Sequence, residues 1–148
     1  MDIEAALVVV QPLLERIKNE GEKAVIAITA EIDGVKIPEL RVPAKIIQKA
    51  LLELDPKVKE ALVEAIKRIE KVHNDQKRAE KKTDVVPGGS VVERWIPVDR
   101  VGLYVPGGKA VYPSSVMMNV IPAKIAGVKS IAVASPPQKD FGGYPHPT

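Results

Sequence analysis

A glycine-rich stretch in the second half of the chain has residue types that suit an anion or a cofactor. Residues 102–108 spell GLYVPGG, after an apolar run and before a segment that opens with Pro113. A turn between a strand and a helix presents backbone N–H groups to an anion. The G-x-G-x-x-G dinucleotide motif is absent, and Gly108 occupies the lysine position of a phosphate-binding P-loop, which excludes that motif. Residue types alone favour a tight turn, with an anion-binding loop as the alternative.

Two histidines are the next residues with ligand chemistry. His73 and Gln76 are one helical turn apart and share a face of the helix that we expect there, and His146 is the other histidine. The chain has no cysteine and no H-E-x-x-H motif, so a zinc site is difficult to build from these residues. The sequence favours a helix-face histidine with a local hydrogen bond over a metal or polar site.

A basic tract and a methionine pair complete the candidates. Residues 71–82 carry several lysines and arginines, but Glu70, Asp75 and Glu80 are interspersed, which favours a solvated helix end over a phosphate-backbone footprint. We expect Met117 and Met118 to be core residues. No Ser/His/Asp arrangement for nucleophilic catalysis can be assembled.

Composition limits the class of protein. The 148 residues are 45% hydrophobic, 28% charged and 3% aromatic, which predicts one soluble domain over residues 1–148 with an aliphatic core. The net charge of +3 is too small to argue for nucleic acid as a partner. The first residues lack the basic region of a signal peptide, and no apolar run approaches the roughly 20 residues that span a bilayer. We therefore expect a cytoplasmic protein with no membrane partner.

The elements that must position these residues divide into two segments. The apolar spacing predicts helices over 3–19, 22–31 and 43–54. A long helix follows with Asp55 as its N-cap and Pro56 as its first residue, so that 1–82 is a helical segment. The β-branched residues of 22–31 leave a strand as the alternative. Residues 90–98, 101–105 and 130–135 suit strands, the last two buried. A helix interrupted by Pro122, with Gly127 as its C′ residue, connects those two. The segment 90–136 is thus a βαβ unit, and residues 136–148 are a loop.

A lone βαβ pair leaves the edges of its sheet unpaired. We therefore expect that the chain is cut short or that it pairs with another copy as a homo-oligomer.

Residues 94–137 resemble the signature region of the histidinol dehydrogenases. The resemblance is carried by RWIPVDRVGLYVPGG at 94–108, by AVYPSSVMMN at 110–119, and by Ser135-Pro136-Pro137 at the end. The segment VHNDQ at 72–76 resembles the His-x-x-Gln segment of the family, and residues 19–34 resemble its Gly-Asp-Ala and Phe-Asp region. The resemblance covers essentially the whole chain.

The resemblance implies an α/β fold, with a helical amino-terminal region followed by a partial Rossmann-like βαβ unit and a short, mostly parallel sheet. It also implies NAD-dependent oxidation of L-histidinol to L-histidine through a bound aldehyde, with a zinc ion holding the substrate. By position, Tyr104, Pro106 and Pro136 match the residues that contact NAD, and the turn at Gly107 and Gly108 would let the cofactor approach the backbone.

Two departures from the family pattern matter. Ile32 replaces a phenylalanine that is associated with the cofactor, which puts the affinity for NAD in question. The zinc ligands and the Glu-His pair of the family fall beyond Thr148. The chain is thus expected to be a truncated or engineered amino-terminal portion that is inactive alone, whereas the alternative is a non-catalytic, self-associating module.

Overall fold

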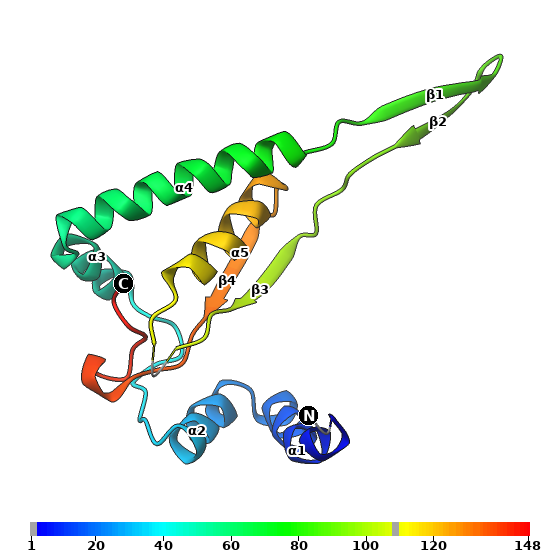
Figure 1. Ribbon diagram of the computed structural model, residues 1–148. Helices are drawn as coiled ribbons and strands as arrows, with labels where there is room; N and C mark the ends of the chain where they lie inside the picture. The colour runs from blue at the N-terminus through cyan, green and yellow to red at the C-terminus, as the bar shows by residue number, and fades with distance from the viewer. Residues whose placement is uncertain (1–2, 108–109) are drawn as a thin grey trace. The chain divides into compact units, whose positions relative to one another are not determined.

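The computed structural model describes residues 3–107 and 110–148, which form a mixed α/β protein (Figure 1). Its contacts divide the chain into two compact units, which are treated separately below. Unit 1 comprises Met1–Leu54, Gly107–Val111 and Ser135–Thr148, and unit 2 comprises Asp55–Pro106 and Tyr112–Ala134. No helix in the described part of the chain is long and apolar enough to cross a membrane.

Unit 1 begins with three helices, α1 (Ile3–Glu20), α2 (Glu22–Ile32) and α3 (Ala44–Glu53). Gly21, at a φ of 62°, separates α1 from α2. The prediction of a helix over 22–31 is therefore confirmed and its strand alternative is wrong, because Ala24 is buried where α2 packs on α1. The two helices are also joined by the Arg16 guanidinium, whose Nη1 donates to Glu31 Oε1 and Oε2 at 3.1 and 2.9 Å.

The last part of unit 1 is more ordered than the predicted loop. A short 3₁₀ helix, η1 (Lys139–Phe141), lies between Gln138 and Tyr144, which form an isolated antiparallel bridge. The Tyr144 hydroxyl donates to Glu39 Oε1 at 3.3 Å. Gly143 has a φ of 81°, and a Cβ there would lie 2.7 Å from the Lys36 carbonyl oxygen. This segment therefore requires glycine to lie against residues 36–39.

Unit 2 begins with the long helix α4 (Pro56–Gln76). As predicted, Asp55 is its N-cap, because one carboxylate oxygen accepts hydrogen bonds from the N–H groups of Lys57 and Val58. The half-buried face includes Leu62, Ile66 and Ile69, at helical spacing. That face is covered by α5 (Pro113–Ile125), which lies alongside α4 (Figure 1).

The helical segment predicted to reach Lys82 is too long. The helix ends at Gln76, because Lys77 adopts an extended conformation, and β1 (Lys81–Val86) follows. This strand pairs antiparallel with β2 (Gly89–Glu93). Gly88, at a φ of 79°, makes the turn, and Val86 lies opposite Gly89. Clustered β-branched residues on both sides of a glycine turn are typical of a hairpin. The interspersed charges of 71–82 favour a solvated helix end instead, and the hairpin was therefore not predicted.

The predicted βαβ order is confirmed within the segment 90–136, but the strand predicted at 90–98 ends at Glu93 and belongs to the β1–β2 hairpin rather than to the parallel pair. The strands β3 (Arg100–Tyr104) and β4 (Ser130–Ala134) are parallel in register, with Tyr104 opposite Ala134, and α5 connects them. Pro122 lies inside a continuous helix rather than interrupting it. Gly127 follows the helix at a φ of 92°. Its N–H donates to Lys124 O, and that of Val128 donates to Ala123 O, which is a Schellman ending. The two sheets are one antiparallel and one parallel pair, rather than one mostly parallel sheet.

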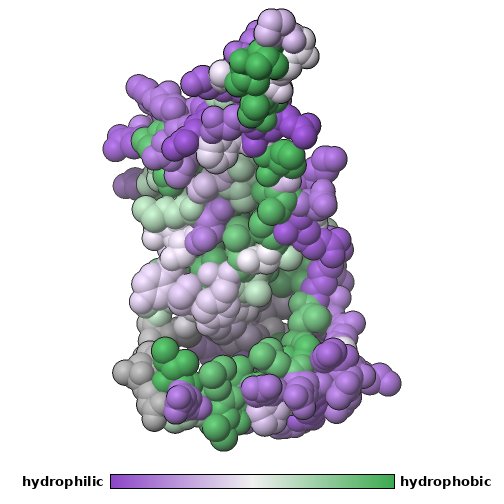
Figure 2. All heavy atoms as spheres, turned by 90° about the vertical axis from the view of Figure 1, so that its right-hand side faces the viewer, coloured by the Kyte–Doolittle hydropathy of each residue, from purple (hydrophilic) through white to green (hydrophobic). Residues whose placement is uncertain are grey.

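The core is aliphatic, as expected, but small. In the described residues the buried apolar side chains are Ala24, Val35, Val105 and Ile121. The strands predicted to be buried are half-buried or exposed, since a two-stranded sheet with one helix leaves its residues accessible. Met118 is 63% exposed and is not a core residue. Figure 2 shows apolar side chains on the surface at the far end of the β1–β2 hairpin, where Val85, Val86 and Val91 are exposed.

Candidate functional site

In unit 2, the carboxyl end of β3 presents an aromatic ring to solvent. The N–H of Val105 donates to the Ala134 carbonyl at 2.8 Å, and Val105 is buried, so the backbone is fixed by strand β4. The alternation of side chains along the strand then directs the preceding Tyr104 outward, where it is 66% exposed. Pro106, which follows the buried Val105, is also exposed. The structure thus holds an accessible, flat apolar surface at a rigid strand end.

In unit 1, Gly107 and Pro136 are in contact. A Cβ on Gly107 would lie 3.2 Å from Ser135 Oγ and 3.3 Å from Pro136 Cδ, which is tighter than an ordinary van der Waals contact. A side chain at position 107 would require Ser135 or Pro136 to shift by a few tenths of an ångström, so glycine favours this close passage of the chain. Gly108, the other glycine of the predicted turn, lies outside the described residues.

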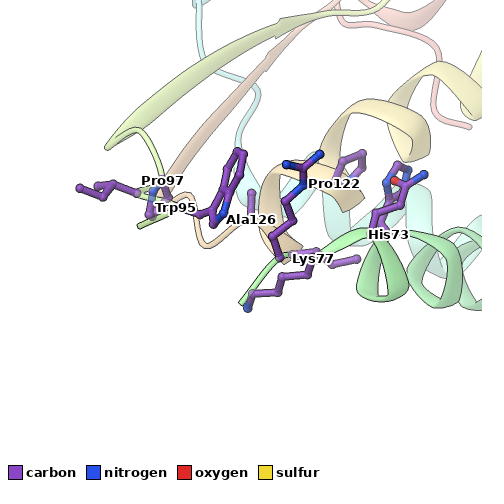
Figure 3. A pocket seen from close by; sticks show the side chains of 10 residues that line it. His73, Lys77, Trp95, Pro97, Pro122 and Ala126 are labelled. Carbon is purple, nitrogen blue, oxygen red and sulfur yellow. The ribbon is translucent and has the colours of Figure 1, made fainter. Parts of the chain in front are cut away.

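Unit 2 also contains a hollow of about 310 Å³, which lies between the end of α4, the segment after β2 and the end of α5 (Figure 3). One side consists of Trp95, Ile96 and Pro97. The other consists of Pro122, Ile125 and Ala126 from the last turn of α5. These walls are apolar and come from segments that are far apart in the sequence.

The polar side of the hollow contains the predicted pair His73 and Gln76, together with Lys77 and Arg78. In the described residues no hydrogen bond joins His73 to Gln76, so the predicted local hydrogen bond of this histidine is not present. The Arg78 guanidinium carbon lies 4.8 Å from the centroid of the Trp95 ring. Residue types and spacing do not predict this contact, because the β1–β2 hairpin separates Arg78 from Trp95 in the sequence.

The described residues contain no group of three or more His, Cys, Asp or Glu side chains that could hold a metal ion. His146 instead packs edge-on against Phe141, with ring centroids 4.8 Å apart, and its Nδ1 accepts from the Thr148 N–H at 3.1 Å. The described residues therefore do not fit a zinc ion.

Ile32, the position associated with the cofactor in the resemblance, is the last residue of α2 and is 63% exposed. Its branched aliphatic side chain offers apolar surface but no ring on which a base could stack.

The fold defines a mixed α/β protein with a parallel βαβ unit and with Gly107 shortly after its first strand. The sequence profile of histidinol dehydrogenase matches residues 1–148, and the chain therefore belongs to the histidinol dehydrogenase family.

Individual relatives agree with this assignment. The chain is 56% identical to the histidinol dehydrogenase of Thermobifida fusca over 148 residues, which are 100% of this chain and 34% of that protein. It is 48% identical to the enzyme of Mycolicibacterium smegmatis over 148 residues, or 33% of that protein. The crystal structure of histidinol dehydrogenase from Elizabethkingia anophelis matches 99% of this chain and 33% of its own, with a TM-score of 0.89 at 31% identity. The chain thus spans about a third of the length of the relatives it matches.

Proposed function

We propose that this chain supplies the NAD-contacting portion of a cytoplasmic histidinol dehydrogenase, the oxidoreductase that converts L-histidinol to L-histidine in histidine biosynthesis. The membership of the family supports the reaction class. The observation that carries the cofactor assignment is the exposed Tyr104 ring at the end of β3, where the backbone is fixed by the hydrogen bond from Val105 to Ala134. In this proposal the βαβ unit is the first, incomplete half of a Rossmann-like fold.

Each proposed residue contributes a different kind of contact. The exposed Tyr104 ring supplies a flat apolar wall, and Pro106 and Pro136 add rigid apolar surface that loses little conformational entropy on binding. Gly107 and Gly108 let the cofactor approach the backbone. When bound, NAD accepts the hydride from the substrate; these residues only bind and orient it.

An NAD titration of the ¹⁵N-labelled 148-residue chain tests the assignment. We expect saturable shifts at millimolar NAD, because a site with few polar contacts binds weakly. Tyr104→Ala should weaken binding at least about fivefold, which corresponds to the loss of one aromatic contact of ~1 kcal/mol. Tyr112→Ala is the matched control, since Tyr112 is also exposed but stands outside the proposed contacts. Absence of saturable shifts at millimolar NAD would reject the assignment.

We do not expect these 148 residues to catalyse the reaction on their own. With added zinc, NAD and L-histidinol, we expect no formation of NADH, because the described residues lack a metal-ligand cluster. Turnover by the purified chain would show that the catalytic groups are already within it.

A second candidate function is a non-catalytic module that associates with a copy of itself. The observation that favours it is that, in the described residues, each sheet has only two strands, so each has two unpaired outer edges. The NAD titration separates the two candidates, since this module would bind no cofactor.

A further inference from the structure

The hollow beside Trp95 plays no part in the proposed function. We propose that it is a second binding site in unit 2, for a small molecule that combines a flat apolar body with an anionic group. Its volume of about 310 Å³ is at the lower end of the range of ~300–1,000 Å³ that is typical of ligand sites.

The walls select an apolar body. Trp95, Pro97 and Pro122 are rigid side chains that lose little conformational entropy when a ligand covers them. Trp95 is 54% exposed, so a ligand in the hollow would remove apolar surface from water. Figure 3 shows the indole of Trp95 and the ring of Pro122 on different sides of Ala126.

The charges favour an anion. Lys77 and Arg78 line the hollow, and none of the described residues that line it is acidic. Two helices end beside it, α4 at Gln76 and α5 at Ile125, and the carbonyl end of a helix acts as about −0.5 of a charge. The two helix ends together count for roughly −1, whereas the two side chains carry two formal positive charges. The balance of charge around the hollow is therefore positive.

Arg78 contributes both to the apolar surface of the hollow and to its positive charge. Its guanidinium lies over the indole of Trp95, with 4.8 Å between its central carbon and the ring centroid. Such stacking orients the planar group and leaves its edge N–H donors available, and a fork of donors matches a carboxylate or a sulfonate. The stacked pair therefore offers an apolar surface and a fixed set of donors side by side.

The test uses 2-naphthalenesulfonate as the anionic probe and 2-naphthylmethanol as its neutral counterpart. The readout is the indole N–H resonance of Trp95 in a ¹⁵N spectrum of the 148-residue chain, which is unambiguous because the chain has one tryptophan. We expect saturable sub-millimolar binding of the sulfonate, with the alcohol binding at least about fivefold more weakly for lack of a charge-assisted hydrogen bond.

Two variants locate the site. Arg78→Gln should weaken sulfonate binding at least about fivefold without changing the affinity for the alcohol. Arg68→Gln is the matched control and should leave both affinities unchanged, since Arg68 lies on α4 away from the hollow and pairs with Glu64 at 2.9 Å. Ala126→Phe should abolish binding of both probes by filling the space. Equal affinities for the two probes, or sulfonate binding that Arg78→Gln leaves intact, would overturn the proposal, as would the absence of saturation.

Discussion

At the scale of single residues, Tyr144 shows how one phenol responds to its surroundings. Burial raises the pKa of Tyr144 above its ordinary value, and the charge of Glu39 and the hydrogen bond to it raise it further. Each of these disfavours the phenolate, because an anion loses hydration on burial and is repelled by a carboxylate. The neutral form of Tyr144 therefore holds the 138–144 segment against Glu39.

The raised pKa of Tyr144 determines how the stability of the folded chain depends on pH. The folded chain binds the phenolic proton more tightly than the unfolded chain, so the stabilisation is complete below a pH of about 10 and is lost as the pH rises through the higher folded value. We predict that Glu39→Gln lowers the pKa of Tyr144, since the repelling charge is gone. The measurement is a ¹³C titration of the Tyr144 ring carbon that bears the oxygen. An unchanged or higher pKa in the variant would show that Glu39 does not interact with the phenol in solution.

At the scale of elements, the residues that cap the helix ends make measurable contributions to the free energy of unfolding. Asp55 satisfies two N–H groups at the start of α4 with one oxygen. We predict that Asp55→Ala lowers the free energy of unfolding by about 1 kcal/mol, the usual value of an N-cap. Asp55→Asn is the control and should cost only a few tenths of that, since its side-chain oxygen still accepts. Urea unfolding followed by circular dichroism measures both, and equal losses in the two variants would show that the carboxylate charge, rather than the cap, matters.

The end of α5 makes a separate prediction. Gly127 has a φ of 92°, but a Cβ there would meet Pro97 at an unstrained 3.5 Å. The cost of Gly127→Ala is therefore conformational rather than steric, and we expect a loss of about 1 kcal/mol in the free energy of unfolding. Gly102→Ala, at a strand glycine whose Cβ would meet open space and whose φ is not positive, should cost less. A smaller loss for Gly127→Ala than for Gly102→Ala in the same urea experiment would contradict the role of the Schellman ending.

Elements with strong local signals could be predicted from the sequence. The cap at Asp55, the glycine after α5 and the βαβ order follow from residue types at fixed spacing, and the structure confirms them. Burial could not be predicted in the same way. Apolar runs such as 101–105 imply a buried strand only if other layers cover both faces, and here one helix covers a two-stranded sheet.

The candidate sites show the same difference between local signals, which the sequence carries, and contacts that depend on the tertiary structure. The spacing predicted that His73 and Gln76 share one face of a helix, and both line the hollow. The contact of Arg78 with Trp95 joins residues separated by a hairpin, and the closeness of Gly107 to Pro136 joins residues separated by α5 and β4. Residue types give no signal for such pairs, since the register and the turns that bring them together are set by the tertiary structure.

At the scale of the whole molecule, the unpaired sheet edges and the exposed valines make self-association the expected behaviour. Unpaired edges present free N–H and C=O groups to a second copy, and isolated two-stranded pairs are at best marginally stable. We predict that the weight-average sedimentation coefficient of the 148-residue chain rises with protein concentration. A lysine on an edge strand opposes pairing by its charge. Val91→Lys, on the hairpin strand β2, and Val133→Lys, on β4, therefore test the two sheets separately.

The matched control for both is Val72→Lys, because Val72 is exposed on helix α4, where no strand edge is available. If the hairpin forms the contact, Val91→Lys alone abolishes the concentration dependence, and if the parallel pair does, Val133→Lys alone has this effect. Loss of association in Val72→Lys as well would point to general hydrophobic clustering instead of edge pairing. A sedimentation coefficient independent of concentration in the unmodified chain would reject association altogether, because edges that remain unpaired at high concentration are protected by their twist or their flanking charges.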